Sequence, residues 1–265
     1  MQAPALAGVI REETTLGAIA EIKNCLYGGA KMIDLHMSCL KDRSDNALKA
    51  IINCTKLPVL ALNYNQNCDW SSAGFSEEER EELFFRAVKL GASGVDIQGY
   101  TFDLPSKTEF KGEDQYSFTK NKPKEVVTDY KIIRKQCNFI EKVHSMGAEV
   151  LLSCHTGLAM KCNEVVDLAL FLQERNPDII KIVTVANNDD DLLESLKTML
   201  AIKREVKTPV VYHASGVAGR LSRVLNPLLG GHMAFCVNGY KESATMEQID
   251  LQTAKLLIDN LNKIR

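Results

Sequence analysis

The sequence predicts a (β/α)₈ barrel, also called a TIM barrel, formed by residues 1–265 as a single domain. Eight short apolar runs alternate with eight amphipathic stretches along the 265 residues, which is typical of parallel strands joined by crossover helices. Polar side chains follow most of the apolar runs, and in a barrel the carboxyl ends of the strands carry the active site. A doubly wound open sheet is the alternative, but Ile10–Thr14 is not the glycine-rich turn that such a sheet needs after its first strand.

Each predicted strand is a short aliphatic run bounded by polar or turn-forming residues. The strands are expected at Ala5–Ile10, Lys31–Leu35, Pro58–Leu62, Gly94–Ile97, Glu149–Ser153, Ile179–Val185, Pro209–Tyr212 and Met233–Cys236. The predicted helices repeat apolar residues at a spacing of three and four. They are expected at Leu16–Leu26, Asn46–Asn53, Glu77–Leu90, Val127–Ser145, Asn163–Glu174, Asp191–Val206, Gly219–Leu229 and Met246–Ile264.

Composition argues against several functional classes. The net charge of −2 gives no basic excess for nucleic acid, and no apolar stretch reaches the roughly 18 residues of a membrane helix. Met1–Pro4 lacks the charged and apolar segments of a signal peptide, so we expect a cytoplasmic protein. The eight cysteines form no C-x-x-C pair and are interpreted as reduced thiols. Because no Cys and His residues cluster with zinc spacing, we expect neither a metal nor a cofactor.

Two predicted loops are long. Asn63–Gly74 follows the third strand, and Gly99–Lys124 is an insertion after the fourth. Loops beyond about 12–15 residues are usually lids, binding elements or disordered segments. Tyr100, Phe102 and further aromatic residues argue against full disorder of the insertion, while a lid, a partner contact and a solvated insertion all stay open.

Lys181 is the residue that differs most from its surroundings. It lies within Ile179–Val185, a β-branched run that a barrel would bury on both faces. Burial disfavours the ammonium form and lowers the pKa of a lysine, which leaves a neutral amine able to form a Schiff base with a ketone. The alternative is a strand-edge lysine whose amine extends to water.

His155 follows the fifth predicted strand and is the expected proton carrier. Neighbouring parallel strands lie about 4.8 Å apart, so His155 and Lys181 can act on one small substrate if both point into the barrel. The amine would form an iminium that acidifies the adjacent carbon. His155 would remove that proton, and a β-hydroxyl could then leave. A capping or core histidine is the alternative interpretation.

Four motifs in this order and spacing resemble those of type I 3-dehydroquinate dehydratases. They are Gly94–Ile97, Ser153–Gly157, Asp178–Val183 and Gly219–Arg223, and the resemblance runs from Gly8 to Ile264. Members of that family are (β/α)₈ barrels that remove water from 3-dehydroquinate through a lysine Schiff base. The product is 3-dehydroshikimate, in the shikimate pathway of aromatic amino acid biosynthesis. The resemblance implies a carbon–oxygen lyase, expected to be a homodimer, acting on a carbocyclic or polyhydroxy ketone.

The resemblance also implies roles for single residues. Lys181 resembles the Schiff-base lysine of the family, and His155 resembles its general acid and base. Arg223 resembles the arginine that binds the substrate carboxylate, a task that suits a planar guanidinium. Gln248 and Ser243 resemble the glutamine and the serine of a closing loop after the eighth strand.

The residues after strands two to four depart from the family pattern. Asp34 and His36 stand where the family has a glutamate and an arginine, and Tyr64 lies near the position of a second arginine. Asp69 is the candidate to replace the glutamate that orients the histidine, and Gln98 replaces another glutamate. Asp69 is therefore expected to join the catalytic pair. The residues expected to bind substrate are Asp34, His36, Tyr64, Asp96, Gln98, Arg223, Ser243 and Gln248.

Other functions stay open at this point. One is a related lyase acting on a different polyhydroxy ketone. Another is a class I aldolase. An aldolase of phosphorylated substrates needs a phosphate-binding site, for which Ser215–Gly216 and Gly230–Gly231 are only weak candidates. A third is a barrel that binds a ligand without catalysis, against which the presence of His155, Lys181 and Arg223 counts.

Overall fold

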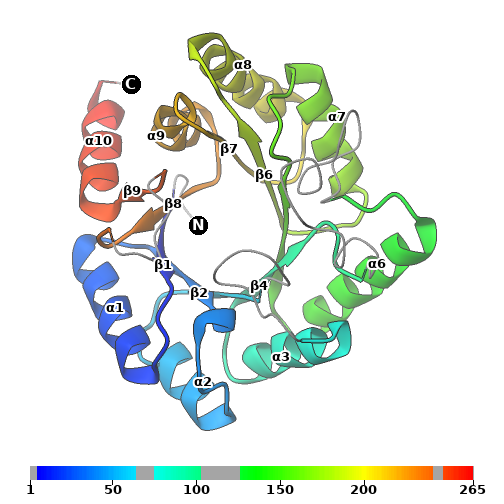
Figure 1. Cartoon of the computed structure of the whole chain (residues 1–265), viewed down its shortest axis with the longest axis vertical. Coiled ribbons are helices and arrows are strands. Elements are labelled where there is room, and N and C mark those ends of the chain that lie inside the picture. The colour runs from blue at the N-terminus through cyan, green and yellow to red at the C-terminus, as the bar shows by residue number, and fades with distance from the viewer. Residues whose placement is uncertain (1–4, 64–74, 103–125, 241–246, 265) are drawn as a thin grey trace.

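The computed structural model describes residues 5–63, 75–102, 126–240 and 247–264 as parallel strands ringed by helices (Figure 1). The strand order is β7-β6-β5-β4-β3-β2-β1-β8-β9, and all neighbouring pairs are parallel. Each of the eight predicted strands is present, which confirms the barrel.

Several strands extend further at their carboxyl ends than the sequence predicted. His36, Gln98 and Ser215 are the last residues of their strands and not loop residues, so strand geometry sets their direction. The strands are β1 (Ala5–Ile10), β2 (Met32–His36), β3 (Val59–Leu62), β4 (Gly94–Gln98), β5 (Glu149–His155), β6 (Ile179–Val185), β7 (Val210–Ser215), β8 (Met233–Val237) and β9 (Ile249–Asp250).

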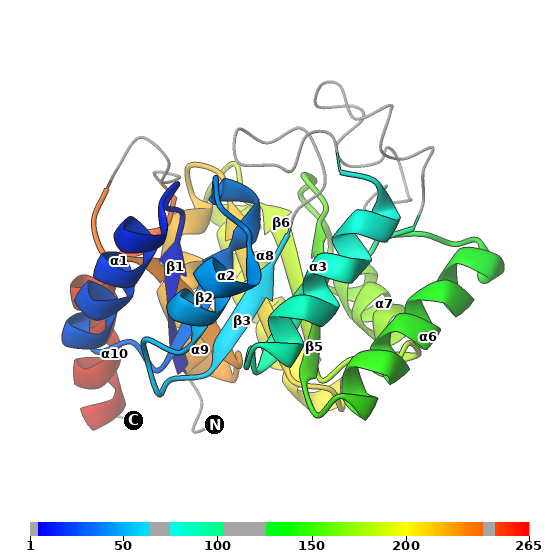
Figure 2. The ribbon, with the colours of Figure 1, turned by 90° about the horizontal axis from the view of Figure 1, so that it is seen from below.

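The helices pack side by side on the outside of the ring (Figure 2). Their N-termini follow local capping signals, such as the box formed by Ser76 and Glu79 at the start of α3. The α-helices are α1 (Thr15–Gly28), α2 (Asp45–Ile52), α3 (Glu77–Lys89), α6 (Tyr130–Ser145), α7 (Cys162–Gln173), α8 (Asp189–Glu205), α9 (Ser222–Leu229) and α10 (Leu251–Lys263), and the 3₁₀ turns are η1 (Met37–Cys39) and η2 (Gly219–Leu221).

The predicted start of the last helix was wrong. That helix was expected from Met246, which lies outside the described residues, but α10 begins at Leu251. Asp250 caps it by accepting a hydrogen bond of 2.9 Å from the backbone N–H of Thr253. The preceding residue, Ile249, is a strand residue that pairs with Cys236.

The seam of the sheet lies between β7 and β8. At its base, the N–H of His232 donates to the carbonyl oxygen of Val210 over 2.9 Å. At the carboxyl end, the N–H of Gly216 donates to Oε1 of Glu247, which precedes β9, also over 2.9 Å. These two hydrogen bonds link the edges of the curled sheet.

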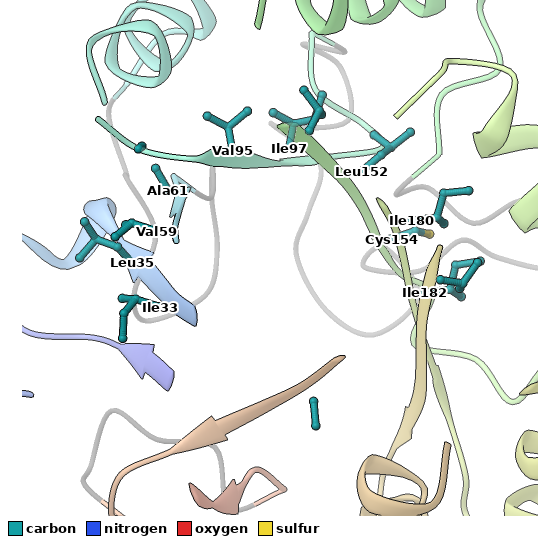
Figure 3. Close-up of a cluster of buried hydrophobic side chains, with 14 of the residues drawn as sticks. Ile33, Leu35, Val59, Ala61, Val95, Ile97, Leu152, Cys154, Ile180 and Ile182 are labelled. Atoms are coloured by element: carbon teal, nitrogen blue, oxygen red, sulfur yellow. The ribbon is translucent and has the colours of Figure 1, made fainter. Parts of the chain in front are cut away.

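Apolar side chains fill two layers. The inner cluster lines the barrel with residues such as Val9, Leu151 and Val211. The larger outer cluster lies between strands and helices, and it includes Ile97 of β4 and Ile180 of β6 (Figure 3). Successive strand residues therefore alternate between the two layers, and a polar residue in an inner position must face the barrel interior.

The described residues include no helix that is long and apolar enough to cross a membrane. They contain seven of the eight cysteines, all as free thiols, and Cys68 lies outside them. Residues 103–125, which include most of the predicted insertion Gly99–Lys124, also lie outside the described part of the chain.

Candidate active site

Lys181 faces the barrel interior. On β6 it pairs with Ser153 of β5 on one side and with Val211 of β7 on the other. Paired residues of adjacent strands point to the same side of a sheet, and Val211 belongs to the inner cluster. The amine of Lys181 is therefore held inside the barrel, which is the orientation that joint action with His155 requires.

His155 and His213 lie nearer than Lys181 to the carboxyl ends of the strands. Both pair with Val183, two residues after Lys181 on the same strand. Because residues two apart share a face, the two imidazoles point to the same interior as the amine. His155 is half-buried and His213 is buried. A small molecule that contacts Lys181 from the mouth would thus be flanked by two histidines.

The surroundings of Lys181 are less apolar than the sequence predicted. Its Nζ lies 3.8 Å from Oδ2 of Asp96 and 4.5 Å from the centre of the Phe235 ring. Oδ1 of the same carboxylate accepts a hydrogen bond of 2.6 Å from the hydroxyl of Ser153. The amine therefore lies between a carboxylate and an aromatic face, and both attract a positive charge.

His213 is held in its neutral form. Burial is the main cause that lowers the pKa of this imidazole well below its usual value, and the charges of Arg223, Lys181 and His155 lower it further. These charged groups come from α9, β6 and β5. Their joint effect on one imidazole shows that side chains from three elements converge at the mouth.

Asp34 and His36 form a buried pair on β2. Nε2 of His36 lies 3.3 Å from Oδ2 of Asp34. Burial lowers the pKa of His36, the Asp34 carboxylate opposes this shift, and the charges of Arg11 and Lys181 add to it. The pair therefore faces the same interior as the lysine, and Arg11, which directly follows β1, borders it.

Arg223 lies at the start of α9 beside the seam. Its Nη2 is 3.3 Å from Oε2 of Glu247, the residue whose other oxygen accepts from Gly216. Gly216 adopts a left-handed φ of 86°, where a Cβ would lie 2.7 Å from the carbonyl oxygen of Ala186, so a side chain there would be strained. This turn brings Glu247 to Arg223. Nε of Arg223 is buried and has no hydrogen-bond partner among the described residues.

Gln98 is held by an arginine that the sequence did not single out. Nη2 of Arg80 donates to Oε1 of Gln98 over 2.7 Å, and Nη1 donates to Oε1 of Glu77 over 2.6 Å. Nε and Nη2 of Arg80 also donate to the carbonyl oxygen of Asn63. This buried cluster ties the carboxyl ends of β3 and β4 to α3. Within the described chain, Nε2 of Gln98 has no hydrogen-bond partner.

Three predicted site residues, Tyr64, Asp69 and Ser243, lie outside the described residues. Gln248 is buried, and its backbone oxygen accepts a hydrogen bond of 3.0 Å from the hydroxyl of Tyr240. The substrate-binding and catalytic roles of all these residues stay predictions.

Sequence reasoning missed the residues that contact the predicted ones. They are Arg11, Arg80, Ser153, Phe235 and Glu247, and Glu77 in turn pairs with Arg80. One signal was available for Ser153 and Phe235, because each lies two positions along its strand from an apolar residue of the inner cluster, Leu151 or Met233.

A parallel (β/α)₈ barrel with a lysine and histidines at the carboxyl ends of its strands has the architecture of a barrel enzyme. The family model for type I 3-dehydroquinase matches residues 8–264. The chain therefore belongs to the type I 3-dehydroquinase family, whose members are carbon–oxygen lyases.

Individual relatives agree with this membership. The chain is 25% identical over 237 residues to the bifunctional chloroplastic 3-dehydroquinate dehydratase/shikimate dehydrogenase of Arabidopsis thaliana, covering 88% of this chain and 33% of that protein. It is 22% identical over 237 residues to the 3-dehydroquinate dehydratase of Methanobrevibacter smithii, covering 89% and 87%. The crystal structure of the 3-dehydroquinate dehydratase from Geobacillus kaustophilus HTA426 matches with a TM-score of 0.79 at 14% identity, covering 99% and 92%, which shows a shared fold.

Proposed function

We propose that this protein is a Schiff-base dehydratase that converts 3-dehydroquinate to 3-dehydroshikimate in the shikimate pathway. The observation that carries the proposal is the interior amine of Lys181, with His155 on the neighbouring strand and nearer to the mouth of the barrel. Family membership supports the same reaction.

The proposed reaction has balanced steps. Counted from the ammonium form, Nζ of Lys181 bonds to the substrate carbonyl carbon and passes two protons to the carbonyl oxygen, which leaves as water, so the positive charge stays on the iminium. His155 takes a proton from the carbon next to the iminium and returns it to the β-hydroxyl, which leaves as a second water. Hydrolysis of the iminium uses one water and releases an enone. The net change is the loss of one water from the substrate.

Arg223 is proposed to bind the substrate carboxylate. It borders the interior that holds His213 and Lys181, since its charge contributes to the lowered pKa of His213. Its buried Nε provides a donor that no described residue uses. A guanidinium binds a carboxylate through two parallel N–H donors, which would orient the ring above Lys181.

A different polyhydroxy ketone is the second candidate substrate. The observation that favours it concerns the residues expected to hydrogen-bond the substrate hydroxyls, which depart from the family pattern. Asp34 is paired with His36, and Gln98 is neutral and accepts a hydrogen bond from Arg80. A site that hydrogen-bonds particular hydroxyls rejects a mismatched ligand, because buried polar groups are left unpaired.

Steady-state kinetics with 3-dehydroquinate tests the proposal through the ultraviolet absorbance of the enone product. We expect kcat/KM within the usual enzyme range of about 10⁴–10⁸ M⁻¹s⁻¹. A far lower value would favour the second candidate. Borohydride added with the substrate should attach it covalently to Lys181, as read by peptide mass spectrometry. The matched control is Lys197→Met, because Lys197 is an exposed lysine on α8 whose loss should leave trapping unchanged.

We further propose a cytoplasmic homodimer. Leu193 and Leu200 support an interface because both are exposed and they lie seven residues apart on one face of α8. Light scattering after size exclusion should give twice the mass of the chain, and Leu193→Glu should give the monomer. A wild-type monomer would refute the dimer.

A further inference from the structure

We propose that Asp96, oriented by Ser153, is the positioning counter-ion of Lys181 and not a substrate-binding residue. This inference rests on the proposed Schiff-base function. The sequence motif around Asp96 pointed to substrate binding, and Ser153 carried no predicted role.

Asp96 lies beside the amine of Lys181 in the barrel interior. On β4 it pairs with Leu151 of β5, whereas Lys181 pairs with Ser153, two residues nearer to the carboxyl end of β5. Adjacent strands of a tilted eight-stranded barrel are also offset by about one residue each, so this difference of two residues over two strands places Asp96 level with Lys181 in the barrel interior. Its exposed fraction is 0%, compared with 7% for Lys181. Asp96 is therefore the less accessible of the two side chains to a substrate that enters from the mouth.

The two oxygens of the Asp96 carboxylate have different partners. Oδ1 accepts from the hydroxyl of Ser153 over 2.6 Å, and Oδ2 lies 3.8 Å from Nζ of Lys181. The same hydroxyl lies 3.3 Å from the carbonyl oxygen of Ile97. Because Ser153 holds one oxygen, the carboxylate cannot rotate freely, and the other oxygen stays directed at the amine.

A fixed carboxylate at this place fits the charge balance of Schiff-base formation. Counted from its ammonium form, Lys181 gives two protons to the substrate carbonyl oxygen, which leaves as water. The positive charge then remains on Nζ as the iminium. Asp96 and the ring of Phe235, 4.5 Å from Nζ on the inner face of β8, therefore lie beside the positive charge of the iminium. Groups that need no reorganisation during a reaction stabilise its charged states most effectively.

A double-mutant cycle with 3-dehydroquinate tests this assignment. Asp96→Asn keeps the shape and removes the charge, so kcat should fall about ten- to a hundredfold, with KM changed by less than about threefold. Ser153→Ala should lower kcat about three- to tenfold. The double variant should be no slower than Asp96→Asn within about twofold, because Ser153 acts through Asp96. Asp259→Asn and Ser145→Ala, at exposed helix positions, are the matched controls and should equal the wild type.

Two kinetic outcomes would overturn the inference. A raised KM with unchanged kcat in Asp96→Asn would make Asp96 a substrate-binding residue. Multiplying losses in the double variant would show that Ser153 acts independently. If Asp96→Asn does not fold, as judged by circular dichroism, Ser153→Ala and Asp96→Glu carry the test. The kcat of Asp96→Glu should be closer to that of the wild type than the kcat of the double variant Ser153→Ala/Asp96→Glu. Equal kcat values for these two variants would refute the orienting role of Ser153.

Borohydride trapping separates this inference from the choice of substrate. Pyruvate, a small keto acid, should be trapped on Lys181 of the wild type, and more slowly on Asp96→Asn by about tenfold or more. A wild type that traps pyruvate but does not turn over 3-dehydroquinate would refute the proposed substrate alone. Equal trapping rates in the wild type and Asp96→Asn would refute the counter-ion alone. Absence of any adduct on Lys181 would overturn both.

Discussion

Replacement of Arg80 by methionine should destabilise the protein more than any surface substitution on α3. Arg80 is 1% exposed, and Nη1 donates to the buried carboxylate of Glu77 over 2.6 Å. Its other donors reach the carbonyl oxygen of Asn63 and Oε1 of Gln98. The second oxygen of Glu77 accepts from the N–H of Phe102. One guanidinium therefore serves the carboxyl ends of β3 and β4.

The expected loss of unfolding free energy follows from the Glu77 carboxylate, which Arg80→Met leaves buried without its partner. Removal of one partner of a buried ion pair costs about 3–5 kcal/mol, because the other charge stays buried without compensation. Methionine matches the length of the stem, so little cavity cost is added. For a chain of this size, about 2–4 °C of melting temperature is lost per kcal/mol, so the melting temperature should fall by roughly 6–20 °C.

Urea unfolding followed by circular dichroism measures this loss. The matched control is Arg86→Met on the same helix, since Arg86 pairs with Asp45 at the surface and such pairs contribute about 0–1 kcal/mol. The double variant Glu77→Gln/Arg80→Met should recover part of the stability, because no charge remains buried. If Arg80→Met costs no more than Arg86→Met, the argument from the buried pair is wrong.

Three further predictions concern the proposed active site. His155→Ala should lower kcat by about 10²–10⁴ while borohydride still traps substrate on Lys181, and turnover like that of the wild type would remove His155 from the mechanism. Arg223→Lys should weaken substrate binding about ten- to a hundredfold, because it loses the planar fork, whereas the control Arg220→Lys should not; the reverse result would move the carboxylate site. The depressed pKa of His213 means that the unfolded chain takes up a proton below pH 6.5 that the folded chain refuses. Stability should therefore fall as the pH drops from about 6.5 to 5, by up to about 1.4 kcal/mol per pH unit for this group. In urea titrations across that range His213→Asn should show a shallower fall, and an unchanged slope would contradict the assignment.

The barrel was predictable because its signals are local. Ala5–Ile10 and Ile179–Val185 were expected at the bounds that the structure shows, since a short aliphatic run between polar or turn-forming residues specifies a strand through its own side chains. The interior position of Lys181 was only a condition at the level of sequence, because the alternation of strand residues decides which of them share a face but not which face lies inside the barrel. The predicted start of the last helix was wrong because Ile249 pairs with Cys236 of β8. The spacing of apolar residues along the chain cannot show a pairing with a distant strand.

Tertiary structure alone decided which side chains meet. Asp96 and Ser153 are 57 residues apart, and only the register of β4 on β5 brings their oxygens together beside Lys181. In the same way, Arg80 reaches Gln98 only because α3 packs across the ends of β3 and β4. A side chain's type and face follow from the local sequence, but its partners depend on strand register and helix docking. Both are set by burial of apolar surface over the whole barrel.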